Sequence, residues 1–213
     1  MKKETKKEMD IVFLLDRSGS MGGMEEDTIG GYNSYLNEQR KNNAKVTTVL
    51  FDDKYELLHQ RENIKNVEDL TKNEYYVRGC TALLDAIGKT INLMDREKAK
   101  KVIFIITTDG LENASREFNR DKIKEMIEKH KNWEFMYIGA DIDSYHEGAS
   151  IGIKKTNISN YRKSKVGVEN LFSSLGKASN SFYEESRVCA DWKEDLENYI
   201  DNNINNIVSI YLV

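Results

Sequence analysis

Apolar runs alternate with amphipathic segments along most of the chain. Short apolar runs bounded by polar or glycine-containing stretches predict strands over residues 9–15, 45–51, 55–59, 101–107, 133–138 and 152–156. Between them, apolar positions recur every three or four residues, which predicts helices over residues 23–41, 82–94, 120–131, 144–151 and 166–185. Strands that alternate with helices are typical of a parallel sheet with helices on both faces. We therefore predict an α/β fold with a Rossmann-like, doubly wound, mostly parallel central sheet.

One predicted strand departs from the parallel pattern. The pair Asp52-Asp53 separates the runs 45–51 and 55–59, and such a short polar connection is typical of a hairpin. We expect residues 55–59 to form an antiparallel edge strand.

The domain boundaries follow from changes in composition. Residues 1–8 form a charged tail rich in lysine and glutamate, and residues 9–187 form the predicted domain. Residues 188–213 form an amphipathic extension with apolar residues at helical spacing, whose last residues, 207–213, fit a strand equally well. This extension is expected either to pack on the core or to dock a partner.

Composition and charge exclude several classes of protein. The 32 basic and 36 acidic residues give a net charge of −4, which argues against a nucleic-acid-binding face and against a polybasic membrane-surface protein. The two cysteines have no metal-binding spacing, and no apolar stretch is long enough to be a signal peptide or a membrane span. We expect a cytoplasmic protein with no nucleic-acid or membrane partner.

Oxygen-bearing side chains gather in three stretches far apart in the sequence. Asp16, Ser18 and Ser20 follow the strand 9–15, Thr81 precedes a predicted helix, and Asp109 follows the strand 101–107. In an open parallel sheet the carboxyl ends of the strands share one edge, where ligands bind at the point at which strand order reverses. Hydroxyl and carboxylate oxygens with few charges suit Mg²⁺. Each stretch alone also fits a simpler role, a turn in the case of Asp16 or Asp109 and a helix N-cap in the case of Thr81.

Together these stretches resemble the von Willebrand factor A (VWA) domain over residues 9–185. The resemblance lies in Asp-x-Ser-x-Ser at 16–20, the threonine at 81 and Thr-Asp-Gly at 108–110. It implies a metal-ion-dependent adhesion site (MIDAS) for Mg²⁺ or Mn²⁺. In the family the two serines act as hydroxyl ligands, the threonine ligates directly or through water, and the two aspartates act largely through coordinated waters. The implied metal residues are Asp16, Ser18, Ser20, Thr81 and Asp109.

The resemblance also suggests a type within the family. With no visible signal peptide and no cysteine pairs, the chain looks more like intracellular bacterial or phage-associated members than like integrins or matrix proteins. Residues 137–143, Tyr-Ile-Gly-Ala-Asp-Ile-Asp, resemble a stretch seen in that bacterial group.

A metal held by neutral hydroxyls and two carboxylates keeps much of its positive charge, so an acidic side chain of a partner protein can complete its coordination. The predicted function is therefore a non-enzymatic, metal-dependent protein-binding module. One alternative is a metal-dependent phosphatase or hydrolase that uses Asp16, but Ser18 stands where a second aspartate is expected. Another alternative is an assembly subunit of a bacterial ATPase or kinase complex.

A second set of residues is predicted to form the rim that touches the partner. It comprises Arg17, Glu112, Asn113, Asp141 and Asp143. Simpler roles stay open for several of them. Arg17 fits a solvated or locally paired arginine, and Asp141 and Asp143 fit caps of the helix that follows them.

Overall fold

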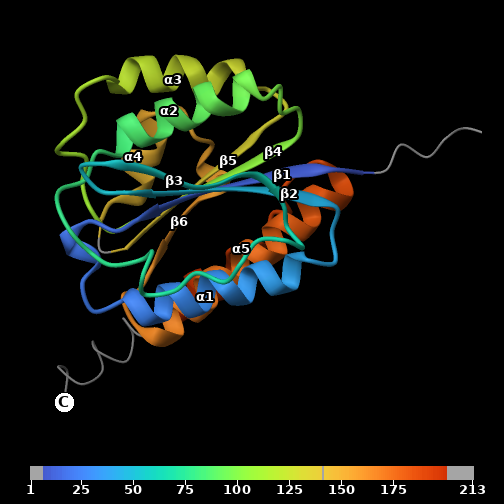
Figure 1. Ribbon diagram of the computed structural model, residues 1–213, viewed down its shortest axis with the longest axis horizontal. Helices are drawn as coiled ribbons and strands as arrows, with labels where there is room; N and C mark the ends of the chain where they lie inside the picture. Colours follow the sequence, from blue (N-terminus) through green and yellow to red (C-terminus); the bar gives the residue numbers. More distant parts are fainter. Residues whose placement is uncertain (1–6, 141, 201–213) are drawn as a thin grey trace, which may run out of the picture.

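A six-stranded sheet lies at the centre of the computed structural model, which describes residues 7–140 and 142–200 (Figure 1). Its strands run in the order β3-β2-β1-β4-β5-β6, and every neighbouring pair is parallel except the antiparallel pair β2 and β3. The strands are β1 (Met9–Asp16), β2 (Ala44–Phe51), β3 (Tyr55–Asn63), β4 (Val102–Thr108), β5 (Glu134–Ala140) and β6 (Ile158–Tyr161). The predicted fold class, including the antiparallel edge strand, is confirmed.

Helices cover both faces of this sheet, as Figure 1 shows. One face carries α2 (Leu83–Arg96), α3 (Arg120–Lys129) and α4 (Ser144–Ser150), and the other carries α1 (Glu25–Gln39) and α5 (Lys165–Glu185). Short 3₁₀ helices occupy Gly19–Met21 and Lys155–Asn157. None of the helices within the described ranges is long and apolar enough to cross a membrane.

β1 is buried along its whole length because both of its faces are covered. Ile11, Phe13 and Leu15 belong to the core under α1 and α5, whereas Val12 and Leu14 belong to the core under α2 and α3. This alternation explains why the run reads as continuously apolar rather than as alternating apolar and polar.

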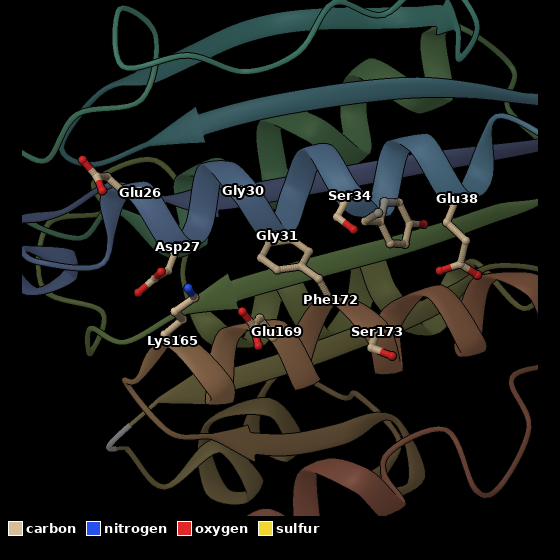
Figure 2. A pocket seen from close by; sticks show the side chains of 11 residues that line it. Glu26, Asp27, Gly30, Gly31, Ser34, Glu38, Lys165, Glu169, Phe172 and Ser173 are labelled. Carbon is tan, nitrogen blue, oxygen red and sulfur yellow. The ribbon is translucent and has the colours of Figure 1, made fainter.

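The contact between α1 and α5 depends on a glycine. A methyl group on Gly31 would lie 2.1 Å from Cδ2 of Phe172, so only glycine lets that ring lie against α1 (Figure 2). A groove of about 640 Å³ runs between the two helices, lined mainly by polar and acidic side chains, with Lys165 at one end (Figure 2).

The last strand lies later in the chain than the sequence pattern indicates. The predicted strand over residues 152–156 is wrong, because the backbone turns there. Gly152 has φ +88°, and Ile153 N–H donates to the carbonyl of Gly148 at 3.0 Å. Ile151 and Ile153 are still buried, which accounts for the apolar pattern, but the strand that pairs with β5 is Ile158–Tyr161.

The described part of the C-terminal extension packs on the domain. Residues 194–200 are helical, and Trp192 and Leu196 are buried in the core on the α5 side. The indole Nε1 of Trp192 donates to the carbonyl of Thr156 at 2.8 Å, and Lys193 Nζ donates to the carbonyl of Ile158 at 3.0 Å. The alternatives raised for residues 207–213 lie outside the described residues.

The edge strand β3 is long but irregular. Its pairing with β2 shifts register around Thr48, and Arg61 near its end has φ +44°. The Arg61 side chain reaches across the sheet edge to Asp10, with Nε 2.7 Å from Oδ1 and Nη2 3.1 Å from Oδ2.

Candidate metal centre

The strand order reverses between β1 and β4. From β1 the chain moves outward on one side through β2 and β3, and it then returns to place β4 on the other side of β1. Asp16 is the last residue of β1, and Asp109 directly follows β4. The two carboxylates therefore lie at the switch point of the sheet, where ligands bind in open α/β sheets.

Asp16 is fully buried, and both of its carboxylate oxygens are held. Oδ1 accepts from the backbone N–H of Ser18 at 2.7 Å, and Oδ2 accepts from the hydroxyl of Thr108 at 2.6 Å. Burial raises the pKa of Asp16 to about 6, although these two hydrogen bonds act in the opposite direction. The folded chain thus holds this carboxylate in a place that favours a nearby positive charge.

A chain of hydroxyls links this carboxylate region to Asp109. The hydroxyls of Ser18 and Ser20 lie 3.0 Å apart, and the Ser20 hydroxyl donates to Asp109 Oδ1 at 2.6 Å. The 3₁₀ turn Gly19–Met21 makes this possible, because it brings residues 18 and 20 to the same side of the loop.

Thr81 does not cap α2, so the N-cap alternative is wrong. The N-cap position belongs to Ala82, and the first N–H groups of the helix are satisfied from another loop. Leu84 N–H donates to Glu112 Oε2 at 2.9 Å, and Asp85 N–H donates to Ser115 Oγ at 3.0 Å. The hydroxyl of Thr81 is therefore not consumed in capping the helix.

The hydroxyl of Thr81 instead reaches the cluster at Gly110. A methyl group on Gly110 would lie 2.5 Å from Thr81 Oγ1 and 3.3 Å from Ser20 Oγ. Asn113 fixes the backbone of Thr81, since its Oδ1 accepts from Thr81 N–H at 2.9 Å and its own N–H donates to the Thr81 carbonyl at 3.1 Å. Ser18, Ser20, Thr81 and Asp109 thus lie together beside Gly110, and Asp16 is linked to them through its hydrogen bonds with Ser18 and Thr108.

The oxygen set at this point fits a hard divalent cation. It offers three hydroxyls and two carboxylates, and Gly110 leaves the space beside Thr81 and Ser20 that a side chain would fill. Within residues 7–140 and 142–200, no group of three or more His, Cys, Asp or Glu is placed to hold a metal ion.

We expect Gly110→Ala to weaken Mg²⁺ binding by roughly tenfold or more, because the new methyl group displaces the Thr81 hydroxyl. Isothermal titration calorimetry of the metal-free protein measures this. Gly30→Ala is the matched control, because a methyl group on Gly30 meets nothing within 4 Å. Equal Mg²⁺ affinity in Gly110→Ala and the wild type would contradict the placement of Thr81 in the site.

The loop that follows Asp109 is tied to the start of α2. Asp85 Oδ1 accepts from the N–H groups of Glu117 and Phe118 at 2.9 Å each, and its Oδ2 accepts from Arg116 N–H at 3.0 Å. Burial acts to raise the pKa of Asp85, but the three backbone donors outweigh it and hold the pKa below its ordinary value.

We therefore expect Asp85→Asn to lower the free energy of unfolding at pH 7 by about 1–3 kcal/mol. A carboxyl whose folded-state pKa is depressed stabilises the fold above its unfolded pKa of about 4, and it loses that contribution as pH falls through the folded value. Urea unfolding at pH 7 and near pH 3 measures the effect. The difference in free energy of unfolding between the variant and the wild type should be smaller at the lower pH, and an equal difference at both pH values would refute this account.

The predicted partner rim is only partly accessible. Arg17 is fully buried and paired with Asp52, so its assignment to the rim is wrong and the local-pairing alternative holds. Both oxygens of Glu112 accept hydrogen bonds inside the loop and from α2, so Glu112 acts as a structural anchor.

The other predicted rim residues have varied positions. Asn113 is exposed beside Thr81, which its Oδ1 holds in place. Asp143 is exposed and caps α4, accepting from His146 N–H at 3.0 Å, as its simpler reading predicted. Asp141 lies outside the described residues.

Sequence reasoning missed one charged residue of the site, Lys163. It lies between β6 and α5, with Nζ 2.7 Å from Asp109 Oδ2 and donating to the Ser20 carbonyl at 2.6 Å. No local pattern marks this lysine, because its position depends on where β6 ends.

Comparison with known proteins agrees with this geometry. The family model described as the von Willebrand factor type A domain matches residues 11–112, which include Asp16, Ser18, Ser20, Thr81 and Asp109. Residues 11–112 thus match the von Willebrand factor type A domain. No curated protein matches the chain.

Solved structures with a similar fold come from varied sources. The pilus adhesin SpaC from Lactobacillus rhamnosus GG gives a TM-score of 0.66 at 14% identity, covering 82% of this chain and 30% of its own. Proximal thread matrix protein 1 from the mussel byssus, solved with a zinc-occupied MIDAS motif, gives 0.61 at 16% identity, covering 82% and 46%. The ArnB paralog VWA2 from Sulfolobus acidocaldarius gives 0.55 at 22% identity, covering 80% and 44%.

These similarities concern the fold. The chain spans less than half the length of each of those three chains, so the activities of the whole proteins do not transfer to it. The MIDAS motif of the mussel protein holds zinc in that structure.

Proposed function

We propose that the chain is a divalent-metal-dependent protein-binding module. Asp16, Ser18, Ser20, Thr81 and Asp109 would hold Mg²⁺ or Mn²⁺, and an Asp or Glu side chain of a partner protein would complete the coordination. The observation that carries the proposal is the cluster of Ser18, Ser20, Thr81 and Asp109 beside Gly110, with Asp16 joined to it through Ser18 and Thr108, at the switch point of the sheet. The bound metal supplies an electrophilic centre, because only two carboxylates offset its charge.

The surroundings of the site support contact with a protein. Among the described residues, the large apolar side chains that are well exposed are Tyr76, Leu111 and Val166. Leu111 lies two residues after Asp109, and Val166 lies three residues after Lys163, which touches Asp109. Tyr76 precedes Gly79, whose carbonyl accepts from Gly19 N–H at 3.2 Å. Apolar side chains around a polar centre are typical of protein-interaction surfaces.

Similar proteins support the same class of function. SpaC is a pilus adhesin, and proximal thread matrix protein 1 is a matrix protein of the mussel byssus, which supports an interaction role. We extend only the interaction role to this chain. Its cytoplasmic location and its intracellular bacterial or phage-associated type remain proposals that rest on the sequence.

A hydrolase that uses Asp16 is the less favoured alternative. The side chain is fully buried, and both of its oxygens already accept hydrogen bonds from Ser18 and Thr108. A nucleophile needs an accessible oxygen within reach of its substrate. A role as an assembly subunit of an ATPase or kinase complex is compatible with protein binding, but Trp192 is buried, so it is not available to dock a partner.

Two measurements test the proposal. Calorimetric titration of the metal-free protein with Mg²⁺ and Mn²⁺ should show binding to one site. An array of peptides that differ only by Glu or Gln at one position should then retain the protein on Glu peptides in Mg²⁺, and not in EDTA. No metal binding, or equal retention on Glu and Gln peptides, would overturn the proposal.

A further inference from the structure

An ammonium group already lies among the oxygens of the candidate metal centre. Lys163 Nζ is 2.7 Å from Asp109 Oδ2 and donates to the carbonyl of Ser20 at 2.6 Å. The Asp109 side chain is 1% exposed and that of Lys163 is 25% exposed, so this ion pair is largely shielded from water. Shielded ion pairs interact more strongly than those on the surface.

The fold holds this lysine in place from both sides. β6 ends at Tyr161, which is buried, and α5 begins after the N-cap Ser164, whose Oγ accepts from Gly167 N–H at 3.1 Å. Gly167 packs so tightly that a methyl group on it would lie 2.1 Å from the carbonyl oxygen of Arg162. The connection that carries Lys163 is therefore fixed at its two ends.

The same carboxylate is needed by the lysine and by the proposed metal. Oδ1 of Asp109 accepts from the Ser20 hydroxyl, and Oδ2 faces Lys163. An ammonium and a divalent cation repel each other at such short range, so they do not share this carboxylate equally. Binding of a metal at Asp109 then requires the ammonium to withdraw.

We propose that Lys163 is a tethered counter-ion that occupies the edge of the metal centre in the metal-free protein and is displaced when the metal binds. This rests on the proposed metal-dependent function and adds its regulation. The lysine neutralises Asp109 in the metal-free state and lowers the apparent metal affinity, because only the fraction of molecules with the lysine withdrawn binds freely.

The test compares Lys163→Met with the wild type by calorimetric titration of Mg²⁺ into metal-free protein. We expect the apparent affinity to rise about tenfold or more, since the competing charge is removed. Lys163→Gln serves as a second neutral variant. Lys165→Met is the control, because Lys165 lines the groove between α1 and α5 rather than the metal centre (Figure 2).

Thermal unfolding gives an independent readout. Without metal, Lys163→Met should melt at a lower temperature than the wild type, because Asp109 loses its counter-ion, and saturating Mg²⁺ should close that gap. Lys165→Met should match the wild type in both conditions.

The outcomes separate this proposal from the proposed function. If the wild type binds Mg²⁺ and the Lys163 variants bind it equally or more weakly, the counter-ion role is refuted while the metal site stands. If neither the wild type nor the Lys163 variants bind Mg²⁺ or Mn²⁺, both proposals fall.

Discussion

Asp16→Asn should abolish measurable Mg²⁺ binding, or weaken it by roughly 10–100-fold, while leaving the metal-free protein at least as stable as the wild type. The two effects have one cause. Burial raises the pKa of Asp16 to about 6, so at neutral pH the folded chain carries a charge that its surroundings disfavour. Asparagine keeps the shape and removes the charge that a bound metal needs.

The hydrogen bonds around Asp16 allow this replacement. An asparagine Oδ1 can still accept from Ser18 N–H, and its amide can donate to Thr108 Oγ1. The Thr108 hydroxyl can then donate to the carbonyl of Gly110, which already lies 3.2 Å away. Calorimetry with Mg²⁺ and thermal unfolding with and without metal measure both effects.

Asp10→Asn provides a matched control on the same strand. Asp10 is 4% exposed and lies at the opposite end of β1, where it pairs with Arg61. Its replacement should leave Mg²⁺ affinity unchanged. A loss of affinity in both variants would mean that the effect is structural, and full Mg²⁺ affinity in Asp16→Asn would remove Asp16 from the metal centre.

Arg17→Ala should lower the free energy of unfolding by about 3–5 kcal/mol, because it breaks a buried ion pair and leaves Asp52 with only the partly exposed Arg78 as its counter-ion. Arg17 is fully buried, with Nε 3.0 Å from Asp52 Oδ2, Nη2 2.6 Å from Glu56 Oε2, and Nη1 donating to the carbonyl of Glu74 at 3.1 Å. Asp52 is equally buried. Chemical denaturation measures the loss.

Arg78→Ala is the control for this effect. Arg78 contacts the same Asp52 oxygen at 2.6 Å, and its guanidinium lies 5.4 Å from the ring centre of Tyr76, as does that of Arg17. Its side chain is 31% exposed, so its removal should cost about 1 kcal/mol or less. Equal losses of unfolding free energy in the two variants would show that the burial of Arg17 does not determine how much it stabilises the fold.

The sheet and the oxygen set could be predicted because both depend on local signals. The runs that become β1 and β4 are mostly apolar, and a parallel sheet places Asp16, at the end of β1, and Asp109, directly after β4, on one edge by topology alone. The turn at residues 16–20 starts at the end of β1, so the strand order alone also predicts that its side chains lie at this edge.

The features that were missed depend on distant contacts. The sequence alone allows Thr81 to cap α2, but Glu112 and Ser115 from another loop accept the hydrogen bonds of the first N–H groups of α2. The sequence alone also allows Arg17 to be solvent-exposed, because its partner Asp52 lies far away in the sequence, directly after β2. Periodicity along one segment carries no information about either contact.

The wrong prediction of the last strand is the reason why Lys163 is missing from the predicted site. Ile151 and Ile153 gave an apolar signal, but they are buried by a turn beside α4. A strand ending at residue 156 would point a different loop at the metal centre. Because β6 instead ends at Tyr161, Lys163 reaches Asp109.

The irregular edge strand β3 affects whether copies of the protein can associate through their sheets. β3 carries His59, Gln60, Arg61 and Glu62 in succession, and its shifted register and the left-handed backbone at Arg61 interrupt a flat edge. β6, at the other edge, is only four residues long. Unpaired strand edges promote sheet-to-sheet aggregation unless charge, irregularity or shortness blunts them. Within the described residues, both edges are therefore poor templates for strand addition, which disfavours association of copies through their sheets.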